Sequence, residues 1–247
     1  LFRSDAQGVF QPVTNLDYEQ AKGWIVEPTI GFATPLRGLA PTEVQRFLDG
    51  RADFTHAFTA AEGLGPIFNQ SSCGSCHNNP VGGPGSQTVT RFGFTDGKGL
   101  FDPLAALGGS LLQAQAITPA CQEVVPPAAN TTALRVTTST LGIGLIEAIP
   151  DAAIAARELT PPSPAVSGRV HWVQPLETPT GPLRAGRFGW KAQVATVLTF
   201  SGDASKNELG FTNRLDGVEN APNGNQALLQ QWDSVADPED QIGRAHV

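Results

Sequence analysis

Two cysteines and a histidine fall within five consecutive residues, Cys73-Gly74-Ser75-Cys76-His77. Two thiols on one helical turn can form thioethers with both vinyl groups of a haem, and the adjacent imidazole can then reach the iron. A redox dithiol, a zinc site or a structural disulfide would also use paired cysteines. Zinc needs two further ligands, however, and Cys121 is the one cysteine left, while a disulfide has no need of His77. The motif therefore predicts haem c bound covalently through Cys73 and Cys76, with His77 as the metal ligand.

The second axial ligand of this haem stays open. The sequence contains no Met, so the His/Met pair that raises the potential of a cytochrome cannot form within it. Apart from His246, which is discussed below, His56 and His171 are the remaining nitrogen donors, although each could equally be a surface or packing histidine. The haem would then be ligated by two nitrogens or open at the sixth position, and an open position could bind peroxide.

Short helices and loops are predicted around the motif. The run Thr42-Glu43-Val44-Gln45 is typical of a capping box that opens a helix, and Ser71 or Ser72 would cap the helical turn of the haem motif. The Gly-rich residues 80–110 are predicted to be irregular. Further elements are expected as a strand at 135–139, helices at 151–159 and 193–200, and a hairpin formed by 170–173 and 183–188. The predicted fold is mainly α, a cytochrome c-like haem domain with a long loop-rich insertion and a little β-structure.

The composition limits the function classes. Hydrophobic residues make up 40% of the 247 residues and charged residues 16%, which is too apolar for a disordered chain. The net charge of −7 disfavours a nucleic-acid partner, because phosphate binding needs clustered Lys and Arg. No run of about 18 apolar residues is present that would span a membrane.

The last seven residues match the translation of a sequencing adapter. The string CAG ATC GGA AGA GCA CAC GTC would encode Gln241–Val247, and from its second base onward it is the start of a widely used short-read sequencing adapter. We therefore interpret residues 241–247, including His246, as a sequencing-adapter artefact. Residues 1–240 are expected to form a first-haem, cytochrome c-like region with an insertion, and a second haem domain is expected to be missing after them.

Four sequence blocks resemble the bacterial di-haem oxidoreductases, which are also described as thiol oxidoreductases or peroxidases. Glu62–Asn69 together with Ser72–Asn78 resembles the first haem segment of that family. Residues 142–151 and 186–193 resemble two further blocks, and 207–213 a fourth, in which Leu209 stands where the family usually has Met. The resemblance implies an enzyme with a second haem c further along the chain. An exported, periplasmic protein is expected from the haem motif, because covalent haem attachment takes place outside the cytoplasm. Its partners would be a small redox protein or another electron donor, and hydrogen peroxide.

This family is in turn similar to the bacterial di-haem cytochrome c peroxidases. By that more distant similarity, Trp190 would relay electrons between the haems and Glu208 would be the acid or base for O–O cleavage. The alternatives are a core tryptophan and a solvated glutamate. Where those peroxidases carry a Gln, Phe200 stands here, which is a departure from the peroxidase pattern.

Three functions follow from these patterns. The leading prediction is a periplasmic c-type di-haem oxidoreductase with peroxidase activity, which carries electrons through its covalent haem. The alternative is a non-catalytic electron-transfer cytochrome c, which would keep its iron firmly coordinated on both sides. A third is an oxygen-activating relative that acts on an organic substrate and needs an apolar pocket beside the haem.

Overall fold

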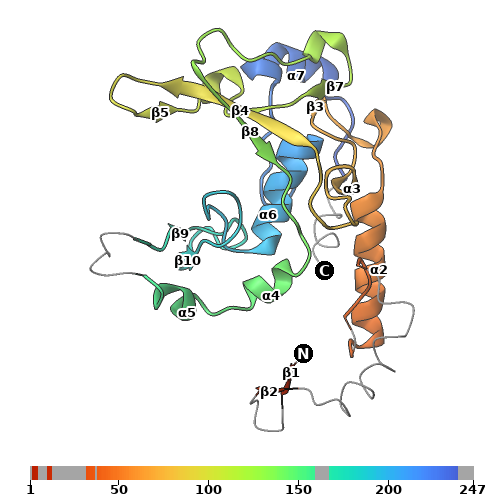
Figure 1. Ribbon diagram of the computed structural model, residues 1–247. Coiled ribbons are helices and arrows are strands. Elements are labelled where there is room, and N and C mark those ends of the chain that lie inside the picture. The colour runs from red at the N-terminus through yellow and green to blue at the C-terminus, as the bar shows by residue number, and fades with distance from the viewer. Residues whose placement is uncertain (1, 5–9, 13–31, 37, 159–166, 239–247) are drawn as a thin grey trace. The chain divides into compact units, whose positions relative to one another are not determined.

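The structure is a computed structural model that describes residues 2–4, 10–12, 32–36, 38–158 and 167–238 (Figure 1). The chain divides into two units, Leu1–Thr34 and Pro35–Val247. In the first unit, β1 (Phe2–Ser4) pairs with β2 (Phe10–Pro12) in an antiparallel ladder. All elements that concern the predicted haem site belong to the second unit.

The prediction of a mainly α fold is wrong. Helices make up 31% of the structure and strands 16%. The α-helices among these residues are α2 (Pro41–Thr55), α3 (Cys73–Cys76), α4 (Ile143–Glu147), α5 (Asp151–Ala155), α6 (Val197–Ala204) and α7 (Gln226–Trp232). None of them has the length and hydropathy to cross a membrane. With 27 Gly and 20 Pro in the sequence, most helical runs end early, because both residues are unfavourable inside helices.

The longest strand lies in a segment for which an irregular structure is predicted. β4 (Thr88–Thr95) forms the centre of a four-stranded antiparallel sheet with β5 (Phe101–Asp102), β6 (Leu111–Leu112) and β8 (Thr131–Val136). β4 is rich in β-branched and aromatic residues, which favour a pleated, half-buried strand. The prediction for residues 80–110 is therefore wrong over this strand.

Two smaller ladders complete the second unit among the described residues. β3 (Ile67–Phe68) pairs with β7 (Gln115–Ala116) just before the haem motif. β9 (Trp172–Val173) pairs with β10 (Arg184–Ala185), which confirms the hairpin predicted from the sequence.

The start of α2 lies close to the predicted capping box. The Glu43 carboxylate accepts a hydrogen bond from the backbone N–H of Ala40 at 2.7 Å, so the reciprocal half of a capping box is present. The helix begins at Pro41, a favoured first position, and continues through the buried Gly50.

Two apolar clusters form the core. The first consists of Phe58, Leu64, Phe68, Leu209 and Phe211, and the second of Phe188, Val194 and Val197. α6 begins at Val197 in the second cluster and leads into η4 (Ser205–Leu209), a π-helical turn that ends at Leu209 in the first. α6 and η4 therefore connect the segment that carries Trp190 with the segment that carries the haem motif.

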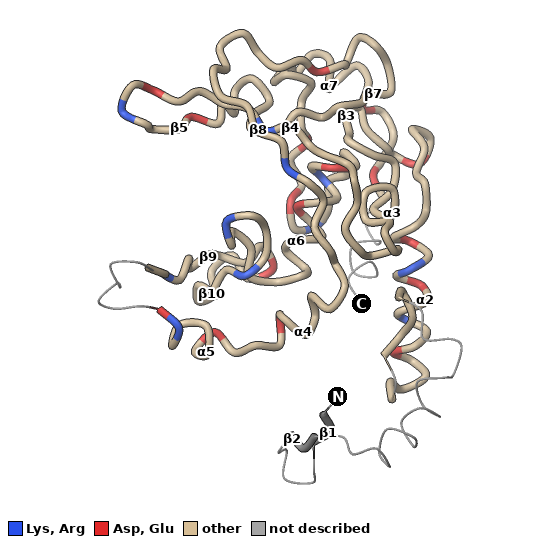
Figure 2. Tube along the Cα trace, in the orientation of Figure 1, with Lys and Arg blue, Asp and Glu red and all other residues tan. Residues whose placement is uncertain are grey.

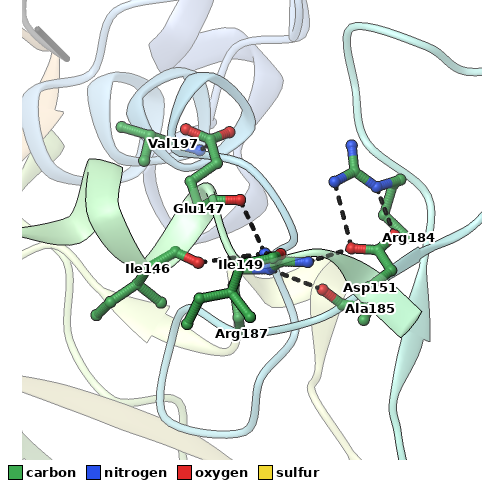
Figure 3. A network of polar contacts seen from close by, with 8 residues as sticks. All are labelled: Ile146, Glu147, Ile149, Asp151, Arg184, Ala185, Arg187 and Val197. Carbon is green, nitrogen blue, oxygen red and sulfur yellow. Dashed lines mark hydrogen bonds and ion pairs between the residues drawn. The ribbon is translucent and has the colours of Figure 1, made fainter. Parts of the chain in front are cut away.

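A buried arginine joins three elements of the second unit. The side chain of Arg187 is 3% exposed and pairs with Asp151, which also accepts a 2.5 Å hydrogen bond from Arg184 in β10 (Figure 3). The guanidinium of Arg187 also donates to the backbone oxygens of Ile146, Glu147 and Ile149. Carbonyl groups at a helix end have no partner within the helix, so Arg187 caps α4 and ties it to α5 and β10.

Candidate haem site

The Cys-x-x-Cys-His motif forms a single helical turn, α3, which is fixed at both ends. The hydroxyl of Ser72 accepts a hydrogen bond from the N–H of Ser75 at 3.0 Å, which confirms the N-cap predicted at Ser71 or Ser72. A Cβ atom on Gly74 would lie 3.3 Å from the backbone oxygen of Phe54, so α3 packs closely on the end of α2. At the other end, the N–H of His77 donates to the carbonyl of Cys73 at 3.0 Å.

Both cysteines of the turn carry free thiols. Cys73 packs against the first apolar cluster, and burial raises the pKa of its thiol to about 11. Burial also raises the pKa of Cys76. The negative charge of Glu208 raises it further, to a smaller extent, and a hydrogen bond with Thr137 lowers it. Glu208 thus lies within electrostatic range of the motif, although it is distant in sequence.

The surroundings of His77 favour the neutral form of its imidazole. Burial lowers its pKa, and backbone groups of Thr138 and Gly83 oppose the shift. The neutral ring is the one that ligates metals. Its Nδ1 atom is buried and has no hydrogen-bond partner among the described residues, which is uncommon in folded proteins. Two free thiols on one turn and a half-buried imidazole with an unpartnered Nδ1 fit a haem held by these three residues.

Glu208 is connected directly to the chain that enters the haem motif. Its backbone oxygen accepts hydrogen bonds from the N–H groups of Asn69 and Gln70 at 2.8 and 3.3 Å. Its side-chain Oε2 accepts a third from Nδ2 of Asn69 at 2.7 Å. Burial raises the pKa of Glu208, while the hydrogen bond from Asn69 and the charge of Arg91 oppose the shift. Figure 2 shows acidic and basic residues close together along α6 and the turn that carries this acid.

Trp190 occupies a more exposed position. Its residue is 59% exposed, and the guanidinium carbon of Arg135 lies 5.8 Å from the centroid of its ring, within the range of a cation–π contact. Arg135 belongs to β8, and Thr137, the partner of Cys76, lies two residues further along the same chain. Trp190 is therefore linked to the haem motif through Arg135 and the end of β8, and its exposure does not fit a core tryptophan.

The two histidines considered as second axial ligands have other partners. Nε2 of His56 lies 2.9 Å from Oε1 of Glu62, and Nδ1 of His171 lies 3.3 Å from the backbone oxygen of Lys191. Both histidines are exposed. Each contact uses one ring nitrogen, so Nδ1 of His56 and Nε2 of His171 would be the atoms left to bind an iron.

Asn69 and Thr137 were not predicted as site residues. Asn69 is 5% exposed in the structure. The signal available in the sequence was a polar residue at the end of the block Glu62–Asn69, next to the motif. Thr137 lies in the segment for which a strand is predicted, but its contact with Cys76 depends on pairing between distant segments, which no local pattern indicates.

Comparison with protein families supports the resemblance seen in the sequence. A family model described as "Di-haem oxidoreductase, putative peroxidase" matches residues 23–97 and 129–226. The first segment contains Cys73, Cys76 and His77, and the second contains Trp190 and Glu208. No match was found among curated proteins or among solved structures. The family match confirms the resemblance, and the family description implies haem as a cofactor.

Proposed function

The chain belongs to the family of di-haem oxidoreductases, and from this premise we propose that it is a periplasmic peroxidase with covalently bound haem c. Cys73 and Cys76 would form the thioether bonds, and His77 would ligate the iron. A second haem c would lie in a part of the protein that follows this sequence. Electrons would come from a small redox protein or another donor. The periplasm is proposed because covalent haem attachment takes place outside the cytoplasm.

Glu208 is the residue that favours peroxide chemistry over simple electron transfer. An electron carrier has no need of an acid beside its haem, whereas cleavage of the O–O bond requires a proton to move from the near to the far oxygen. Burial raises the pKa of Glu208, which brings it closer to the pH at which a group can both accept and release a proton. Its place beside the Cys-x-x-Cys-His turn is the observation that supports the proposal most.

The residues around the haem would each have a separate role in the reaction. When bound, the haem supplies the iron at which hydrogen peroxide takes up two electrons and two protons to give two molecules of water. Glu208 would pass a proton between the two oxygens. Asn69 would hold the Glu208 carboxylate, and the apolar cluster behind Cys73 would keep water from that side of the site.

Covalent attachment is tested by the pyridine haemochrome spectrum of protein matured in a periplasm that assembles c-type cytochromes. We expect a c-type spectrum and haem that stays with the protein in acid acetone. Replacement of Cys73 and Cys76 by Ser should release the haem to the solvent. Extraction of the haem from the unchanged protein would contradict the proposal.

Peroxidase activity is tested in the protein with both haems. Glu208→Gln should slow peroxide turnover by about 10²–10⁴-fold, the usual cost of removing a positioned acid or base, without changing the haem absorption spectrum. Glu62→Gln is the matched control, because Glu62 lies near the same motif but is exposed. Equal turnover in the Glu208 variant and the unchanged protein would remove the acid–base role from Glu208, and absence of peroxide turnover in the unchanged protein would favour the alternative, a non-catalytic electron-transfer cytochrome c.

A further inference from the structure

Asn69 is a buried residue with all of its polar groups in hydrogen bonds. Its backbone N–H donates to the backbone oxygen of Glu208. Its side-chain Nδ2 donates to Oε2 of the same residue. Its Oδ1 accepts from the N–H of Ala114 at 3.0 Å, and its backbone oxygen accepts from Nε2 of Gln115 at 2.7 Å. These contacts place Asn69 between Glu208 and the strand β7, four residues before Cys73.

We propose that Asn69 is a positioning residue that fixes the carboxyl group of Glu208 and favours its charged form. The inference rests on the role proposed for Glu208, and it adds the residue that controls that acid. A side-chain amide that donates to a carboxylate stabilises the ionised acid. Loss of the donor would leave Glu208 protonated up to a higher pH.

Other charged and titratable groups also face Glu208. Arg91 in β4 lowers its pKa and Asp203 in α6 raises it, in addition to the larger effect of burial. Cys73 and Cys76 in α3 face it as well, since its charge acts on both thiols. Asn69 differs from these groups because it contacts the carboxylate directly, at 2.7 Å.

The orientation of the Asn69 amide is fixed by its surroundings. Its oxygen must face the N–H of Ala114, which can only donate, so its NH₂ group must face Glu208. An aspartate at this position would keep the acceptor for Ala114 and lose the donor for Glu208. Asn69→Asp separates the two contacts, but it also places a second carboxylate beside Glu208, which raises the pKa of that acid by itself. Asn69→Ala adds no charge and therefore tests the donor alone.

The protonation of Glu208 can be followed by the infrared carboxyl band of the haem-loaded chain as a function of pH. The band is assigned by its loss in Glu208→Gln, and the measurement needs no peroxide. We expect Asn69→Asp and Asn69→Ala to move the midpoint upward by about one to two pH units, the effect of a hydrogen bond to a charged group. Asn213→Ala is the matched control, because Asn213 is also 5% exposed and donates instead to Gly202. This control should leave the midpoint unchanged.

An unchanged midpoint in variants that keep the native circular dichroism spectrum would overturn the inference. If Asn69→Ala fails to fold, Asn69→Ser decides, because it removes the amide donor without placing a second carboxylate beside Glu208. Peroxide turnover in Glu208→Gln distinguishes the role proposed for Asn69 from the role proposed for Glu208. A shifted midpoint with normal turnover in Glu208→Gln would refute the acid–base role of Glu208 and leave Asn69 as the residue that controls its protonation. Slow turnover in Glu208→Gln without a shifted midpoint would refute the role of Asn69 alone.

Discussion

Replacing Arg187 should destabilise the protein strongly. Its side chain is 3% exposed and pairs with Asp151, and its guanidinium donates to the backbone oxygens of Ile146, Glu147 and Ile149 (Figure 3). Arg187→Ala would remove the donor that these carbonyls share, leave Ile146 only its bond from the N–H of Ile149, and remove one of the two cations beside Asp151. Breaking a buried ion pair by removing one partner costs about 3–5 kcal/mol. That loss is a large fraction of the total stability of about 5–15 kcal/mol that is usual for a domain.

Arg184 provides the matched control. It binds the same carboxylate, at 2.5 Å, but its side chain is 38% exposed, so Arg184→Ala should cost only about 0–1 kcal/mol. The loss of stability in Arg187→Lys should lie between the losses in Arg187→Ala and Arg184→Ala. Lysine keeps the charge but lacks the planar set of donors that reaches several acceptors at once. Urea denaturation followed by circular dichroism gives the free energy of unfolding for each variant. Equal losses in Arg187→Ala and Arg184→Ala would refute the assignment of Arg187 as the residue that holds α4, α5 and β10 together.

Three further predictions concern the cysteines, a buried acid and the tryptophan. In haem-free protein, alkylation of Cys73 should accelerate as the pH approaches the thiol pKa of about 11. Glu208→Gln should lower that pKa because it removes a negative charge. Equal alkylation rates in the variant and the unchanged protein would contradict this. Burial and a hydrogen bond with Asp237 raise the pKa of Glu219 to about 8, so folding favours the protonated acid. The free energy of unfolding should therefore fall between about pH 5 and pH 8, and urea titrations of Glu219→Gln should show a smaller fall. Trp190→Phe should slow electron transfer between the haems in stopped-flow measurements more than it lowers stability, because the residue is 59% exposed; a larger effect on stability would assign Trp190 a structural role.

Features with a local cause were predictable from the sequence. The haem motif needs one helical turn, and its cap at Ser72 lies immediately before it. The β9–β10 hairpin follows from two short segments on either side of a Pro/Gly turn. In each case the residues that determine the structure are neighbours in sequence or connected by a single turn.

Features that depend on distant pairing were missed or misplaced. β4 pairs with β8 over Thr88–Gly93, and the many glycines around β4 hid its β-branched and aromatic pattern. α6 begins at Val197, later than the predicted start at residue 193, because the hydroxyl of Thr196 caps it by accepting from the N–H of Thr199. That cap could have been read from the sequence, whereas the pairing of β4 required knowledge of its partner.

The position of Glu208 shows why the site needed the structure. The resemblance pointed to this residue, but its contact with Asn69 spans 139 positions in sequence. The contact depends on the π-helical turn η4 and on Gly210, whose φ of +74° suits glycine. A Cβ atom on Gly210 would also lie 2.6 Å from the backbone oxygen of Ile67, so only glycine lets the turn approach β3 closely enough. The same backbone contacts that hold the entry to the haem motif therefore bring the acid beside it.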